Sequence, residues 1–332
     1  MGNKKWWIGI PLILTIAYLI GPTPLKPSFN KDLPLVPTTP NAVEQYIAQN
    51  EKQHKIKPDN EARIVWADNS LKEKTDYSIV YLHGFSASQG EGEPTHRNIA
   101  KKFGCNLFLS RLAEHGIDTT EALVNLTSEK YWQSAKEAFA IGQQLGNQVI
   151  LMGTSTGGTL ALKLAAEYPD VQALVLLSPN IAINDKNAWM LNNPWGLQLA
   201  RLFSHSQYVT SKDKRALFKK YWFDHYRLEG AVALEELLES SMNKETFNKV
   251  NQPVLCLYYY KDEIHQDSVV KVSAMKKMFE ELGTPGEKKR IIAMPETGTH
   301  VIGSYIRSRD VAGVQKEIEA FLKDIIRIPA KK

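Results

Sequence analysis

The sequence has few of the features that hold small or elongated proteins together. Only two cysteines occur in 332 residues, so disulfides cannot form a framework. Lys and Arg number 41 and Asp and Glu 36, a net charge of +5, and four of these charges belong to lysines at the two termini. No basic stripe interleaved with aromatic residues occurs, which gives little support to a nucleic-acid partner. With 43% hydrophobic and 23% charged residues, the composition is that of a soluble globular chain and excludes general disorder or many membrane spans.

The N-terminus departs from this average. Lys4 and Lys5 precede residues 6–21, a run of sixteen residues without charge, which predicts a signal or anchor segment at residues 1–21. The run is shorter than the ~20 residues that span a bilayer, which is typical of a cleaved signal peptide. Small residues are missing at a cleavage site around Gly21, however. We therefore expect a retained membrane anchor with the body exported outside the cytoplasm, and a secreted or periplasmic protein after cleavage is the alternative.

Residues 22–60 are expected to form a tether and one helix. Six prolines from Pro22 to Pro40 favour an extended, semi-rigid spacer. Apolar residues within 41–50 then have the spacing of one helical face. Nothing before Pro40 has the periodicity of a core element, so the spacer is expected to lie outside the folded body.

Beyond residue 60, short apolar runs alternate with helical segments. This alternation predicts βαβ units and a mainly parallel sheet with helices on both faces, an α/β fold. It covers residues 61–180 and 252–332, whereas residues 181–251 interrupt it with helical sequence dense in aromatic residues. The predicted strands are residues 63–67, 77–82, 105–109, 148–152, 172–177, 254–258 and 290–294.

A Gly-x-Ser-x-Gly motif follows the fourth predicted strand. Gly153, Ser155 and Gly157 stand between this strand and a helical pattern at residues 158–168. The strand–turn–helix context is that of a nucleophile elbow, in which the turn is too tight for side chains two residues before and after the serine. The alternative is an ordinary glycine-rich turn or a phosphate loop, but neither a P-loop Lys nor a Gly-x-Gly-x-x-Gly pattern is present. Ser155 is therefore the predicted nucleophile.

A serine nucleophile needs a base that is backed by a carboxylate. His300 follows the last predicted strand in a short polar loop and is the predicted base, the alternative being a surface histidine. Asp262 lies closest to the end of the preceding strand and is the predicted acid, with Asp267 and Glu263 as alternatives. The chain order serine, acid, histidine is the one that this architecture requires.

An oxyanion hole needs two backbone N–H donors. Thr156, directly after the serine, and Phe85, after the second predicted strand, are the expected donors. His83 precedes Phe85 by two residues and is expected to brace this loop, because a catalytic base should follow the acid in the chain.

These motifs resemble the α/β-hydrolase superfamily over about residues 61–328, and carboxylesterases, monoacylglycerol lipases and serine aminopeptidases in particular. Glu114 and the pair Tyr259 and Tyr260 depart from glycines that are usual in those families, which affects the subfamily assignment alone. The matching features are Leu82-His83-Gly84-Phe85, the stretch from Arg111 to Gly116, the Gly-x-Ser-x-Gly motif, Asp262 and His300.

The resemblance implies a hydrolase core formed by residues 61–180 and 252–332, with residues 181–251 as a helical cap. It also implies hydrolysis of a carboxylic ester, or less often an amide, without cofactor or metal. In the implied strand order three strands separate Cys105 from Cys256, a distance of ~19 Å. A disulfide is excluded at that distance, so both are expected to be buried free thiols.

The predicted cap is rich in aromatic residues. As a set they favour an apolar wall for the acyl or aryl group of a substrate, although each ring alone could instead pack within the cap. Nine of them lie within 38 residues: Trp189, Trp195, Phe203, Tyr208, Phe218, Tyr221, Trp222, Phe223 and Tyr226.

The sequence thus predicts a serine hydrolase that cleaves small-molecule carboxylic esters with an apolar acyl group through an acyl-enzyme. One alternative is a peptidase or amidase with the same triad, in which Glu235, Glu236 or Glu239 of the cap would hold a substrate N-terminus. The other is a catalytically silent binding protein, against which the complete triad argues. The oligomeric state is not indicated.

Overall fold

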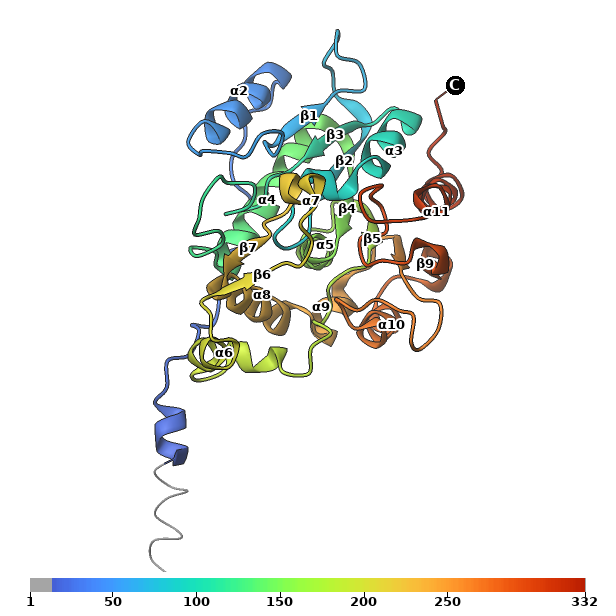
Figure 1. The fold of residues 1–332 in the computed structure, drawn as a ribbon. Coiled ribbons are helices and arrows are strands. Elements are labelled where there is room, and N and C mark those ends of the chain that lie inside the picture. The colour runs from blue at the N-terminus through green and yellow to red at the C-terminus, as the bar shows by residue number, and fades with distance from the viewer. Residues whose placement is uncertain (1–13, 332) are drawn as a thin grey trace, which may run out of the picture.

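The structure, a computed structural model, describes residues 14–331. A seven-stranded sheet forms its centre, in the order β1-β3-β2-β4-β5-β8-β9 (Figure 1). β1 runs antiparallel to β3, and the other neighbouring pairs are parallel. Each predicted strand belongs to this sheet, which confirms the predicted fold class. The strands are β1 (Arg63–Val65), β2 (Thr75–Leu82), β3 (Asn106–Leu109), β4 (Gly146–Thr154), β5 (Val171–Leu177), β8 (Val254–Tyr258) and β9 (Lys289–Ala293).

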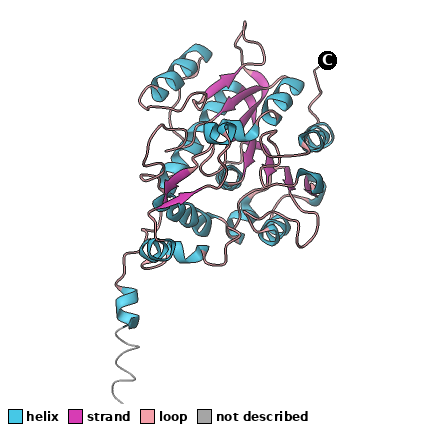
Figure 2. Cartoon of the chain, viewed as in Figure 1, coloured by secondary structure: helices cyan, strands magenta, loops and turns pink. Residues whose placement is uncertain are grey.

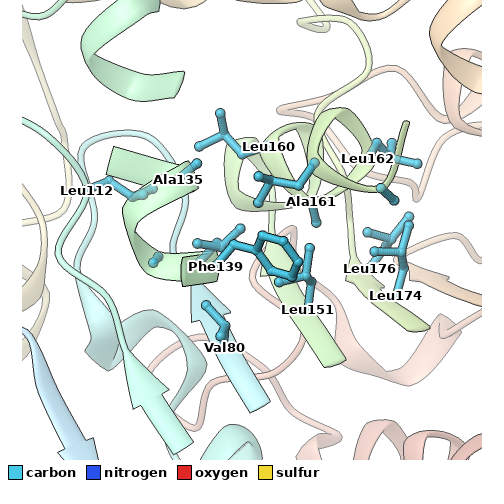
Figure 3. Packing of buried hydrophobic residues seen from close by; sticks show 14 of the residues in the cluster. Val80, Leu112, Ala135, Phe139, Leu151, Leu160, Ala161, Leu162, Leu174 and Leu176 are labelled. Atoms are coloured by element: carbon cyan, nitrogen blue, oxygen red, sulfur yellow. The ribbon is translucent and has the colours of Figure 1, made fainter. Parts of the chain in front are cut away.

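Helices cover both faces of the sheet (Figure 2), because successive residues of a strand point to opposite sides. Val80 of β2 packs with α4 and α5, in the apolar cluster of Figure 3. Ile79 and Tyr81 point to the other side and pack with α3 and α11. Burial on both faces explains why these strands are continuous apolar runs in the sequence. The core helices are α2 (Pro40–Glu51), α3 (Thr95–Phe103), α4 (Ser128–Leu145), α5 (Thr156–Glu167), α10 (Val272–Glu281) and α11 (Val311–Asp324).

The segment between β5 and β8 forms the cap. It is mainly helical, but β6 and β7 form an antiparallel pair that the sequence did not indicate. Strands of three residues are too short for a period of two to stand out. The cap contains a 3-10 helix (Ala188–Asn192), α6 (Gly196–Ser204), β6 (Tyr208–Thr210), α7 (Ala216–Tyr221), β7 (His225–Arg227), α8 (Leu228–Ser241) and α9 (Lys244–Lys249).

The proline-rich segment is not a free spacer. Residues 28–36, which we call the strap, lie against α4 and α5 of the core. The Phe29 ring packs on the apolar core, and the Lys163 ammonium lies 3.9 Å from its centroid. The Trp132 indole N–H donates to Asn30 O at 2.6 Å. The expectation that nothing before Pro40 belongs to the folded body is therefore wrong, since an extended strap packs without any helical or strand periodicity.

The first part of the expected anchor, residues 1–13, lies outside the described residues. Residues 14–19 are helical, and Trp195 of the cap contacts this segment: its indole N–H donates to Ala17 O and its backbone N–H donates to Pro22 O, both at 2.9 Å. Among residues 14–331, no helix combines the length and the apolar character needed to cross a membrane.

Candidate active site

Ser155 lies between β4 and α5, at the carboxyl edge of the sheet. Its backbone has φ 53° and ψ −118°, a conformation that is strained for any residue with a side chain. The neighbouring glycines have no room for a Cβ, which would lie 1.9 Å from Leu82 O at Gly157 and 2.4 Å from the backbone of Gly157 at Gly153. The motif thus forms the tight elbow that the sequence predicts.

The expected oxyanion donors flank the serine. Phe85 follows Gly84, whose Cβ position would lie 3.0 Å from Ser155 Cβ, so this loop passes directly beside Ser155. The Thr156 N–H is the first of α5, where the helix dipole favours negative charge. Within residues 14–331, neither N–H donates to another protein atom. Both are therefore free to bind an oxygen of a ligand.

The acid beside His300 is Asp267. Its Oδ2 lies 2.6 Å from His300 Nδ1, and its Oδ1 accepts the backbone N–H groups of Val269 and Val270. Asp267 is 1% exposed, so the bond to the imidazole is shielded from water. This arrangement assigns the proton of neutral His300 to Nδ1 and leaves Nε2 for a substrate or nucleophile.

The prediction of Asp262 as the acid is wrong. Asp262 is exposed and pairs with His265 at 2.9 Å. Residues 260–266 form a turn closed by bridge pairing between its ends, so its tip extends into solvent. The chain returns to the sheet edge only at Asp267, whose N–H donates to Tyr259 O at 3.1 Å. Asp262 is closer than Asp267 to the end of β8 along the chain, but it is not the carboxylate that lies beside His300 in space. Glu263, the other alternative, bonds the Tyr260 hydroxyl.

The pKa of His300 follows from opposing effects. Burial lowers it, but the carboxylate of Asp267 and, more weakly, that of Glu91 outweigh burial and raise the pKa above the ordinary value. His300 Nε2 is buried and has no hydrogen-bond partner within residues 14–331, so it does not accept the hydrogen bond from Ser155 Oγ that a catalytic base is expected to accept. Catalytic hydrogen bonds are often long before substrate binds, and both side chains face the same cavity.

That cavity has a volume of about 830 Å³ and lies between the sheet edge and the cap. Four of the nine cap aromatics contribute to its wall: Phe203, Phe218, Trp222 and Tyr226. Phe203 is itself largely exposed, at the edge of the cavity, whereas Trp189 and Trp195 are exposed and do not line it. The cap therefore supplies an apolar wall over Ser155, as the set of aromatics predicts.

A family model described as serine aminopeptidase, S33, matches residues 128–298, just over half of the chain. The chain belongs to this family of α/β-hydrolases. Over 117 residues, 35% of this chain and 46% of the relative, it is 27% identical to a thermostable monoacylglycerol lipase of Bacillus sp. (strain H-257). The match thus spans about half the length of that curated relative.

Solved structures show the same fold at low identity. A metagenome-derived lipolytic enzyme of the LipS and LipT study aligns with a TM-score of 0.63 and 15% identity, over 81% of this chain and 99% of that one. The monoacylglycerol lipase of Paleococcus ferrophilus gives 0.56 and 15%, over 79% and 97%. Est1E of Butyrivibrio proteoclasticus with bound ferulic acid gives 0.54 and 16%, over 80% and 94%. The α/β-hydrolase fold that the sequence resembles is therefore confirmed.

In this S33-family chain, two buried histidines brace the loop that carries Phe85. His83 accepts the Leu112 N–H at Nε2 and bonds Gly84 O through Nδ1, at 3.0 and 2.9 Å. Burial lowers the pKa of His83 to about 4. His115 Nε2 accepts the Ser86 N–H at 3.0 Å. His83 is thus neutral with both nitrogens engaged, in keeping with the bracing role that the sequence suggests.

The cap acids considered for an aminopeptidase lie outside the wall of the cavity. Glu236 bonds the Ser128 hydroxyl and Glu239 bonds the Asn192 amide, both at 2.7 Å. Glu235 is buried and likewise does not line the cavity. Residues 14–331 contain no cluster of side chains suited to hold a metal ion.

Glu91 is not among the residues that the sequence predicts for the site. It lies in the 3-10 turn Gln89–Gly92, is 2% exposed and lines the cavity with Ser155 and His300. The signal that could have found it is a glutamate between two glycines, shortly after the oxyanion loop.

Proposed function

We propose that this protein is a serine hydrolase that cleaves carboxylic esters with an apolar acyl group. The observation that carries the proposal is one cavity lined by a strained Ser155, by a His300 backed by buried Asp267, and by cap aromatics. The likeness to lipases and esterases supports the same class of reaction.

In the proposed reaction, Ser155 Oγ attacks the ester carbonyl carbon while His300 Nε2 takes its proton. The oxyanion that forms accepts hydrogen bonds from the Phe85 and Thr156 N–H groups. The C–O bond to the alcohol then breaks, and the alcohol leaves with the proton from His300. Water attacks the acyl-enzyme by the same steps and releases the carboxylic acid and free serine.

Ester rather than amide cleavage is favoured by the placement of the cap acids and by the apolar wall of the cavity. An aminopeptidase needs a carboxylate placed to hold the substrate ammonium group, and the cap acids Glu236 and Glu239 are bonded elsewhere. The wall contributed by the cap is mainly apolar, which suits an acyl chain.

A substrate panel tests this proposal. Purified protein is expected to hydrolyse p-nitrophenyl esters from acetate to decanoate. It should turn over aminoacyl p-nitroanilides at least ~10²-fold more slowly in kcat/KM, because none of the cap acids Glu235, Glu236 and Glu239 lines the cavity to hold a substrate ammonium. Faster turnover of the anilides than of the esters would refute ester hydrolysis as the main activity and support the aminopeptidase alternative. Absence of turnover on both panels would favour the silent binding protein.

We further propose that the N-terminal segment holds the catalytic body at a membrane outside the cytoplasm. Its sequence supports this, with lysines before an uncharged run. The segment lies beside α6 (Figure 1). Leu19 and Ile20 of the segment and Leu202 and Phe203 of α6 are exposed apolar side chains. In the alternative, the protein is also exported, but the N-terminal segment is cleaved and the mature protein is secreted or periplasmic.

Deletion of residues 1–21 is expected to leave an active enzyme that no longer sediments with membranes, because the strap remains in place. The matched control, deletion of residues 1–36, removes the strap and should lower Tm by about 5 °C or more through lost apolar contacts. Membrane fractionation of the full-length chain completes the test. A soluble, shortened mature chain would establish cleavage, and membrane binding by the 1–21 deletion would refute the anchor.

A further inference from the structure

Glu91 is a buried acid at the nucleophile. Its Oε2 accepts the Gly84 N–H at 2.5 Å. Its two carboxyl oxygens lie 2.8 and 3.0 Å from the position that a Gly84 Cβ would take, and Ser155 Cβ lies 3.0 Å from the same point. The carboxyl oxygens therefore lie no more than about 6 Å from Ser155 Cβ.

The contact with Gly84 orients the oxyanion loop. Gly84 directly precedes Phe85, whose N–H is one of the two free donors beside Ser155. A buried backbone N–H without an acceptor is costly, so the carboxyl group of Glu91 favours the one loop conformation that satisfies it. Any acceptor at this place would do the same, whether charged or neutral.

The charge of Glu91 is a separate property. Burial raises its pKa to about 7, although the Gly84 N–H and His300 partly offset this effect. Glu91 is thus ionised above neutral pH, and within residues 14–331 it has no Lys or Arg in an ion pair.

The other charged groups around the cavity do not cancel this charge. His300 pairs with Asp267, and Arg307 pairs with Asp213, each at 2.6 Å. Asp185 also lines the cavity but is exposed, so water screens it. Two further titratable neighbours, Tyr81 and Tyr131, are buried phenols whose pKa values burial raises well above the ordinary value, so both are neutral.

We propose that Glu91 is a positioning residue for the oxyanion loop, and that its negative charge excludes carboxylate ligands from the active site. The inference rests on the proposed ester hydrolysis. The carboxylate product is released with an oxygen at the oxyanion position, next to Glu91, where like charges at a few ångströms repel. The acid product is therefore expelled, and esters with an anionic acyl group are poor substrates.

Glu91→Gln separates the two roles, because the amide oxygen can still accept the Gly84 N–H while the charge is gone. Calorimetry should show hexanoate binding to Glu91→Gln more tightly than to the wild type at pH 8.5, on the order of tenfold. The difference should shrink below pH 7, where Glu91 takes up a proton. Neutral 1-hexanol should bind both proteins equally. Equal hexanoate affinity at pH 8.5 would overturn charge exclusion.

Glu93→Gln is the matched control for charge. Glu93 lies two residues away, pairs with Arg97 at 2.9 Å and does not line the cavity, so its removal should leave hexanoate binding unchanged. Binding is measured without turnover, so the two proposals can fail separately. If the wild type cleaved no ester but still bound hexanoate less tightly than Glu91→Gln, the proposed function would be refuted and the exclusion of carboxylates by Glu91 would stand.

Glu91→Ala tests the positioning role, since it leaves the Gly84 N–H without an acceptor. We expect kcat to fall by about tenfold or more with little change in KM, and Glu91→Gln to restore most of it. The acidic limb of the kcat/KM profile should also move to lower pH in Glu91→Gln, because the charge that raises the pKa of His300 is lost. Equal kcat for the Ala and Gln variants would overturn the positioning role.

Discussion

Replacing Ser155 by alanine is expected to lower kcat/KM for p-nitrophenyl butyrate by about 10³-fold or more. The variant cannot form the acyl-enzyme, and only the oxyanion donors and the binding cavity remain to assist water. The fold should persist, because alanine keeps the Cβ that already occupies the strained position at φ 53°. Ester hydrolysis at saturating and limiting substrate, together with Tm, measures both expectations.

Fluorophosphonate labelling supplies the control. Ser86 is the other serine that lines the cavity, so Ser86→Ala should still react with the probe whereas Ser155→Ala should not. Retained labelling and turnover in Ser155→Ala would show that another group is the nucleophile.

The sheet and the elbow could be predicted because their causes are local in sequence. A parallel strand buried on both faces must be apolar throughout. The sequences of β4 and β5 show such apolar runs, which can be recognised without knowing which strands lie beside them. Gly153 is needed because the backbone of Gly157 lies against it, and Gly157 is needed because Leu82 O of the neighbouring strand β2 lies against it. Such constraints leave a direct mark on residue type.

The acid could not be fixed in the same way, because loop conformation decides it. The carboxylates of Asp262, Glu263 and Asp267 all lie within nine residues after the end of β8 at Tyr258. Only the turn at residues 260–266 determines which of them returns to the sheet edge. The sequence therefore predicted a carboxylate in this loop, but not which one.

The strap and Glu91 were missed for a related reason. The strap binds the core through backbone carbonyls such as Asn30 O and through single side chains such as Phe29, which produce no periodic pattern. Glu91 is a buried acid, and whether a charged residue can be buried depends on a polar partner that the loop conformation supplies, here the Gly84 N–H seven residues earlier.

Asp267→Asn is expected to lower kcat by about 10²- to 10⁴-fold, whereas Asp262→Asn should leave kcat within a factor of ~2. The Asp267 carboxylate holds the proton of His300 on Nδ1 and stabilises the imidazolium that forms when Nε2 takes the serine proton. An asparagine can instead donate its amide N–H to Nδ1, which favours the wrong tautomer. Asp262 lies at the exposed tip of the same loop and bonds only to its own turn, so it is a matched control for a lost carboxylate.

The pH dependence separates this role from simple destabilisation. The proposed reaction requires neutral His300, so activity should be lost as the pH falls through the pKa of that residue. Because the Asp267 carboxylate raises this pKa, its removal should move the acidic limb of the kcat/KM profile of the residual activity to lower pH. Asp262→Asn should leave the limb in place. A large loss of activity in Asp262→Asn with a normal Asp267→Asn enzyme would mean that the loop after β8 rearranges on substrate binding to bring the tip carboxylate to His300.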